Sequence, residues 1–304
     1  MGPTVETEAR VVTPIHSPEF SLSHRTQFVG PPGQHHSVDD VFIGSEALAK
    51  GVLTRGQLRW NFRPIFPDVY MHAEATPSLP QRAFGAWLWS GRRAVIGGLT
   101  AAALHNARWI SDSEDVEVLW GNSHPPRGIV ARNARIESDE IVDVAGLPIT
   151  TPERTALDIA RHHPRDIAVA RLDPLASATG ITTRAVQSLV ARYEGTRHWW
   201  RAVESLSLMD GGSHTPYETM VRLELIDSGL PAPRTQFTVT DGGASAVLAM
   251  GYEAPKVAVE FDSVTPEFVQ RQGWTIVRAS HAYNKYAIAY LVRAAVIEAG
   301  WRYY

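Results

Sequence analysis

The sequence predicts a mixed α/β fold (α+β mixed) divided into several domains. The chain has 304 residues, about twice the usual length of one domain. Hydrophobic residues make up 44% and charged residues 20%, a balance typical of globular chains that can bury a core. Segments with helical spacing of apolar residues also alternate with short strand-like runs. These three observations favour several compact units that combine helices with sheets.

Residues 1–38 are predicted to be a flexible leader. They contain scattered proline, serine and histidine without a sustained hydrophobic period. His35 and His36 make a poor metal site without a third ligand. A secretion signal would begin with basic residues followed by an apolar stretch, whereas this sequence has Glu6 and Glu8 at those positions. No apolar run in the sequence is long enough to span a membrane. Since the chain also has no cysteine, we expect a soluble cytoplasmic protein.

Residues 39–77 have the outline of a small winged helix. A short helix should end near Gly51, and Thr54 should cap a second helix. Residues 62–71 then form a hairpin interrupted by prolines. The net charge of the chain is −3, so contact with DNA requires a local basic patch, and the segment 50–67 contains four basic residues and no acidic one. The residues predicted to contact DNA are Lys50, Arg55, Gln57, Arg59 and Arg63. The alternative is a solvated helix face packed on a neighbouring domain.

Residues 78–195 are predicted to be an α/β companion domain. Its helices are expected over residues 80–93, 99–106, 166–177 and 182–193, and its strands over 116–120, 128–133, 141–144 and 146–149. Thr150 and Glu153 form a capping-box pair in front of a further helix, with Pro152 in its first turn. His105 is expected to pack or to form a buried hydrogen bond. His162 and His163 follow a helix end, where cations interact favourably with the helix dipole.

Residues 196–304 are predicted to be a compact mixed sheet flanked by helices. After a helix over 199–209, the order α-β-β-β-α-β-α describes the remainder. The opening helix covers 217–226, the strands cover 236–240, 247–251, 256–261 and 274–278, and the closing helix covers 286–299. We interpret Trp199 and Trp200 as anchors buried between domains rather than as a platform for bases.

Short motifs occur in a fixed order along residues 41–300. They are LTRGQL (53–58), PDVY (67–70), LTAAALH (99–105), GLPIT (146–150), PERTALD (152–158), TPYE (215–218), GLP (229–231), KVAVEFD (256–262) and GW (273–274). In this order they resemble actinobacterial proteins that join an AbiEi-type antitoxin winged helix and its companion domain to a C-terminal domain. That last domain is similar to very-short-patch-repair endonucleases of the PD-(D/E)XK class, which implies a restriction-endonuclease-like sheet.

The resemblance implies Mg²⁺-dependent phosphodiester hydrolysis at carboxylates from a helix and two strands. Glu218 corresponds to the helix acid, and Glu260 and Asp262 share one face of a strand. The family places its central metal-binding aspartate at the position of Ala249, and a methyl group cannot ligate a metal ion. The histidine and most of the basic helix that follow the strand acids in the family are also missing, although His281 or His214 could compensate. Alternatively, the three carboxylates are solvated or salt-bridged.

Three hypotheses follow. The first is a DNA-associated regulatory or defence protein whose nuclease-like domain has lost hydrolysis and needs no cofactor. The second is a divergent nuclease that holds Mg²⁺ at Glu260 and Asp262. The third is an antitoxin-like protein that binds a protein toxin. The sequence contains neither a P-loop nor a Gly-x-Ser-x-Gly elbow, and it leaves the oligomeric state open.

Overall fold

The computed structural model describes residues 41–121, 124–261, 264–280 and 284–302. Within these residues the chain forms eleven α-helices and three β-sheets, which confirms the mixed α/β class. No helix in these ranges is long and apolar enough to cross a membrane. The predicted leader lies outside the described residues.

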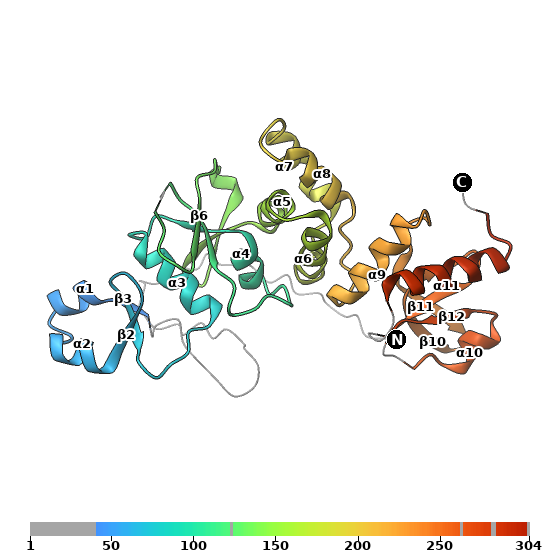
Figure 1. The fold of residues 1–304 in the computed structure, drawn as a ribbon, viewed down its shortest axis with the longest axis horizontal. Coiled ribbons are helices and arrows are strands. Elements are labelled where there is room, and N and C mark those ends of the chain that lie inside the picture. The colour runs from blue at the N-terminus through green and yellow to red at the C-terminus, as the bar shows by residue number, and fades with distance from the viewer. Residues whose placement is uncertain (1–40, 122–123, 262–263, 281–283, 303–304) are drawn as a thin grey trace, which may run out of the picture. The chain divides into compact units, whose positions relative to one another are not determined.

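The first sheet belongs to a small N-terminal unit (blue in Figure 1). Its elements are β1 (Phe42–Ile43), α1 (Gly44–Ala49), α2 (Arg55–Asn61), β2 (Phe62–Phe66) and β3 (Val69–His72). The strands pair antiparallel in the order β1-β3-β2. Thr54 caps α2 as predicted, because its side chain accepts from the backbone of Gln57 while the Gln57 side chain accepts from the backbone of Thr54. The two helices and the hairpin are therefore present where the sequence predicts them.

The second sheet has five strands in the order β6-β5-β4-β8-β7. It contains β4 (Val95–Ile96), β5 (Val116–Leu119), β6 (Ile129–Arg132), β7 (Ile141–Val144) and β8 (Leu147–Thr150), with α3 (Leu79–Trp89), α4 (Gly98–Leu104) and the 3₁₀ turn η2 (Ser138–Glu140) between them. Strand β4 is absent from the sequence prediction. It has only two residues, yet it pairs with both β5 and β8 and so completes the sheet.

Four helices follow this sheet and share one core. They are α5 (Pro152–His162), α6 (Arg165–Thr179), α7 (Thr183–Arg192) and α8 (Trp199–Ser207). Their buried faces include Leu157, Leu172, Val186 and Leu206. The interpretation of Trp199 and Trp200 as buried anchors is wrong for Trp200, which is 63% exposed, while Trp199 is partly buried. The predicted cap of α5 is wrong by one residue, because Thr151 and not Thr150 accepts from the backbone of Arg154.

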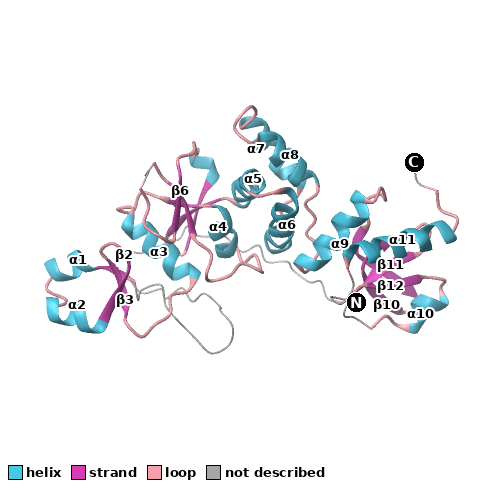
Figure 2. Cartoon of the chain, viewed as in Figure 1, coloured by secondary structure: helices cyan, strands magenta, loops and turns pink. Residues whose placement is uncertain are grey.

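The third sheet has the order β12-β11-β10-β9, and only β11 and β12 run parallel. Its elements are α9 (Pro216–Asp227), β9 (Arg234–Asp241), β10 (Ala244–Tyr252), β11 (Val257–Glu260), α10 (Glu267–Arg271), β12 (Thr275–Arg278) and α11 (Lys285–Glu298), in the predicted order of helices and strands. Helices α9 and α11 pack together in one hydrophobic cluster, and α10 belongs to another (Figure 2). With five residues, α10 is as short as the sequence predicts.

Candidate functional site

Two arginines stand out on the exposed side of α2. Arg55 and Arg59 are both solvent-exposed, and Leu58 is the only buried residue of the helix. Neither arginine forms an ion pair with any carboxylate in the described residues. The Arg59 guanidinium lies 5.7 Å from the ring centroid of Trp60, whose side chain is 78% exposed. Helix α2 thus presents cationic and aromatic groups to solvent.

The other residues predicted to contact DNA are already engaged within the chain. Lys50 lies 3.9 Å from Glu46, and an Arg63 Nη2 donates to the carbonyl of Ala75 at 2.6 Å. The side-chain oxygen of Gln57 accepts from the backbone of Thr54, so only its amide nitrogen is left for a ligand. All three side chains are nevertheless exposed.

In the C-terminal domain, the structure brings Ala249 and Glu260 together. Strands β10 and β11 pair antiparallel, with Met250 opposite Val259. One position further along, the backbone N–H of Ala249 donates to Glu260 Oε1 at 2.8 Å. The alanine therefore stands beside the strand acid. Asp262 lies outside the described residues.

Glu218 has a structural task at the start of α9. Its carboxylate accepts from the backbone N–H of His214 at 2.8 Å and from the hydroxyl of Thr215 at 3.2 Å. The side chain is mostly buried. No group of three or more metal-ligating side chains occurs among the residues that the structure describes, a set that excludes Asp262 and His281.

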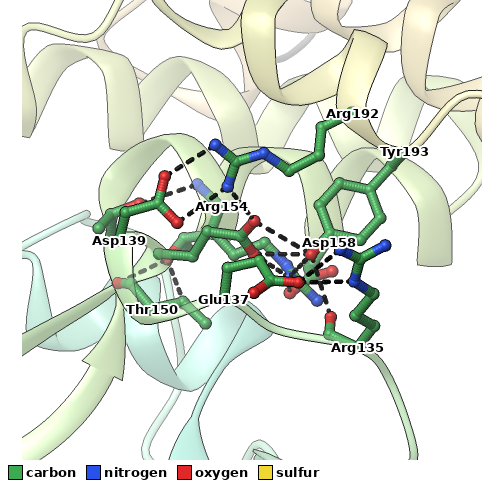
Figure 3. Close-up of polar contacts among 11 residues, drawn as sticks. Arg135, Glu137, Asp139, Thr150, Arg154, Asp158, Arg192 and Tyr193 are labelled. Carbon is green, nitrogen blue, oxygen red and sulfur yellow. Dashed lines mark hydrogen bonds and ion pairs between the residues drawn. The ribbon is translucent and has the colours of Figure 1, made fainter.

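A buried ionic network, which the sequence analysis does not predict, joins η2 to α5 and α7 (Figure 3). The fully buried Arg154 donates from Nε to Asp158 at 2.9 Å, and from Nη1 to Glu140 and to the hydroxyl of Tyr193. Tyr193 donates in turn to Glu140 at 2.8 Å. At the rim, Arg192 bonds both Asp139 and Glu140. The signal in the sequence is the four-residue spacing of Arg154 and Asp158 within the PERTALD motif.

The electrostatics of this network follow from its burial. Burial raises the pKa of Asp158, while the neighbouring Arg154 opposes that rise. Burial and the hydrogen bond to Glu140 raise the pKa of Tyr193 to about 12. Hydrogen bonds to Asp139 and Glu140 raise the pKa of Arg192. The charges of the network are paired with one another, although Arg154 Nη2 and Asp158 Oδ1 are buried without a hydrogen-bond partner in the described residues. The pairing favours a structural role.

Three histidines of this region have lowered pKa values. His105 shares a 2.7 Å hydrogen bond with the carbonyl of Thr150, the kind of contact predicted for it, and burial lowers its pKa. Burial also lowers the pKa of His163, and it lowers that of His162 to about 3. The lowered pKa values favour neutral imidazoles, which gain less from the dipole of α5 than the cations expected from the sequence.

Comparison with known proteins supports part of the resemblance. Residues 95–208 match the family model of the AbiEi antitoxin C-terminal domain, and this segment spans β4 to α8. Uncharacterised proteins from two strains of Mycobacterium tuberculosis are 29% identical over 149 residues, which is 44% of this chain and 55% of theirs. The chain thus spans about half the length of the curated relatives it matches.

A crystal structure of another Mycobacterium tuberculosis protein is also similar. It is 16% identical, the match covers 66% of this chain and 83% of that chain, and the TM-score is 0.37. The segment 95–208 is thus similar to the AbiEi antitoxin C-terminal domain by its family match alone.

Proposed function

We propose that this chain is an antitoxin-like protein that binds DNA through α2 and carries a C-terminal domain that does not cut DNA. The observation that carries the DNA-binding part is the exposed pair Arg55 and Arg59, which lack carboxylate partners in the described residues. The family match of residues 95–208 supports the antitoxin-like part.

The position of the two arginines suits phosphate contact. They lie four residues apart on one helix, so they project from the same face. Neither arginine has an ion pair with the described residues to break before it binds, and an exposed guanidinium can release the counterions of DNA on contact. Glu46 of α1, one of the acidic residues of this unit, is held by Arg92 through two hydrogen bonds of 2.8 and 3.0 Å. Repulsion of phosphate by Glu46 is therefore reduced.

The test is a salt titration of binding to a short labelled duplex. The variant Arg55→Ala/Arg59→Ala should bind more weakly, and the slope of log K against log salt should fall by about two, because two phosphate contacts are lost. The matched control Arg184→Ala/Arg302→Ala removes the same charge from exposed positions outside α2 and should keep the native slope. A native slope in the α2 variant would contradict the proposal.

The proposal that the C-terminal domain does not cut DNA rests on the surroundings of Glu260 and Glu218. Ala249 stands beside Glu260 where the resembling nucleases carry an aspartate, and Glu218 is committed to the first turn of α9. With these side chains the domain offers Mg²⁺ too few free oxygen ligands among the described residues. We infer that it binds nucleic acid or a partner instead of hydrolysing phosphodiesters.

Inhibition of a protein toxin is the second candidate function, and the family match of residues 95–208 favours it. If the chain acts in this way, it should purify from its native cells with a protein whose expression alone arrests growth, and co-expression should restore growth. The Arg55→Ala/Arg59→Ala variant separates the two functions, since it should lose DNA binding and keep the rescue. Failure of the native chain to restore growth would remove this candidate.

A further inference from the structure

A cationic pocket lies at the junction of β6, α5 and α8, and neither the DNA-binding proposal nor the toxin proposal uses it. Its volume is about 540 Å³, which is within the usual range of small-molecule sites. Its basic lining consists of Arg132, Arg161, His162, Arg197, His198 and Arg201. None of the described residues that line it is acidic.

Most of the positive charge in this pocket is unpaired. Arg132 is held by Glu117, with an Nη2–Oε2 distance of 2.7 Å. Arg161, Arg197 and Arg201 form no ion pair with any carboxylate in the described ranges of the chain. Three guanidinium groups therefore line a pocket in which the described residues supply no carboxylate counter-charge.

The pKa values of His162 and His198 are lowered in part by the positive charges that line the pocket. Burial, together with the charges of Arg132 and Arg161, lowers the pKa of His162 to about 3. The pKa of His198 is lowered by burial and by Arg201, Arg197 and Arg161. A proton is repelled at both rings, and the same potential attracts an anion.

The buried network described above positions part of this lining. The Arg161 guanidinium lies 6.0 Å from the ring centroid of Tyr193, whose hydroxyl is bonded to Glu140. Nε and Nη2 of Arg161 also donate to the carbonyl of Arg197, each at 3.3 Å. The pocket is thus partly preorganised, which lowers the entropic cost of binding.

Two helix ends meet at the pocket. The start of α8, with His198 as its N-cap, contributes a partial positive charge, and the end of α5 contributes a partial negative one. Each pole amounts to about half a charge, so together they leave the field of the three unpaired arginines nearly unchanged.

We propose that this pocket binds an oligophosphate anion, the group that nucleoside diphosphates and triphosphates share. A single carboxylate would neutralise only one of the three unpaired arginines, whereas adjacent phosphates supply several charges and oxygen pairs that match guanidinium forks. The lining comes from three elements around one cavity rather than from an extended groove that could follow a nucleic-acid backbone. The proposal does not depend on DNA binding by α2.

The test is calorimetric titration of the full chain with tripolyphosphate. The native chain should bind it more tightly than inorganic phosphate. Arg201→Gln should weaken tripolyphosphate binding by about tenfold or more, because one charged hydrogen-bond donor is lost. Arg184→Gln removes the same charge from an exposed position on α7 and should keep native affinity. Circular dichroism of each variant checks that the fold is retained.

A second measurement keeps the proposal open to refutation if Arg201→Gln fails to fold. In the native chain, bound tripolyphosphate should raise the pKa of His162. NMR chemical shifts of the ring nitrogens of His162, followed against pH, measure this change. Absence of binding, an equal loss in Arg184→Gln, or an unchanged His162 would each overturn the proposal. Binding of a single-stranded oligonucleotide without binding of tripolyphosphate would also overturn it, in favour of a nucleic-acid surface.

Discussion

Arg154 is a single buried cation that satisfies groups on three elements. It contacts Glu140 of η2, Asp158 of its own helix and Tyr193 after α7. Arg154 and both of these carboxylates are almost fully buried. A buried ion pair adds little net stability compared with an apolar pair, but removal of one partner leaves uncompensated charge in the interior.

We therefore expect Arg154→Met to reduce the free energy of unfolding by about 3–5 kcal/mol. Urea unfolding followed by circular dichroism measures this change. Arg135→Met is the matched control, because Arg135 pairs with Glu137 at the surface and its side chain is 73% exposed. That surface pair should contribute at most about 1 kcal/mol. Similar losses in the two variants would show that the buried network is not what stabilises this domain.

His162 links stability to pH. Its pKa in the folded chain is about 3, below the ordinary value of 6.5, so between these values the unfolded state binds one more proton. Stability should therefore fall as the pH is lowered from about 6.5 towards 3. His162→Gln should show a shallower fall in melting temperature over this range, because it carries no titrating ring. Identical pH profiles for the two chains would contradict the depressed pKa.

Among the elements, helix starts are well predicted because the capping signal is local. Thr54, Thr182 and Thr215 each cap a helix close to its predicted start. The exception lies before α5, where two threonines are adjacent. Thr150 pairs with Ile141 in the sheet and its hydroxyl bonds that of Thr155, so Thr151 is left to cap the helix. That choice depends on strand pairing, which the local sequence does not specify.

The pairing of strands β10 and β11 leads to a prediction about DNA cleavage and metal binding. The native chain should show no nicking of DNA in Mg²⁺ or Mn²⁺. Ala249→Asp places a second carboxylate beside Glu260, on a partly exposed position of β10. We expect this variant to bind Mn²⁺ more tightly than the native chain, because two adjacent carboxylates supply hard oxygen ligands. Calorimetry measures the binding.

Ala246→Asp is the control for this substitution, since it adds the same charge to a partly exposed position on the same strand. Equal Mn²⁺ affinity in the two variants would show that Ala249 does not occupy a lost ligand position. Nicking restored by Ala249→Asp and abolished by Glu260→Gln would place the loss of activity at one residue. Metal binding without nicking would indicate that the short α10 also contributes to the loss.

At the scale of the whole molecule, a cluster of charged residues close together in the sequence can be predicted from the sequence alone. A contact between residues far apart in the sequence cannot. The exposed Arg55 and Arg59 follow from a short basic segment, so the sequence alone finds them. The pair of Arg192 and Asp139 joins residues 53 apart, and the cationic pocket joins β6 to α8. Such sites depend on tertiary packing, and no local period or motif indicates them.

A second buried ion pair ties α9 to the preceding helices. Arg222 of α9 donates to Asp173 of α6 at 2.8 Å and to the carbonyl of Leu208, also at 2.8 Å. Asp173 additionally accepts from the hydroxyl of Thr219. Both charged side chains are nearly inaccessible to solvent. Local opening of α9 would therefore expose a buried charge on α6, which should couple the stabilities of the two helices.

We expect Arg222→Met to speed amide hydrogen exchange in both α9 and α6, because Asp173 loses its buried cation and about 3–5 kcal/mol of stabilisation is removed. Exchange followed by mass spectrometry resolves the two helices. Arg293→Met removes a guanidinium of α11 that donates to the carbonyl of Ser228 at 3.1 Å and forms no ion pair within the described part of the chain, and it should leave α6 unchanged. If Arg222→Met alters α9 alone, the ion pair does not transmit stability between the helices, and the antitoxin-like segment would then be independent of the sheet that follows it.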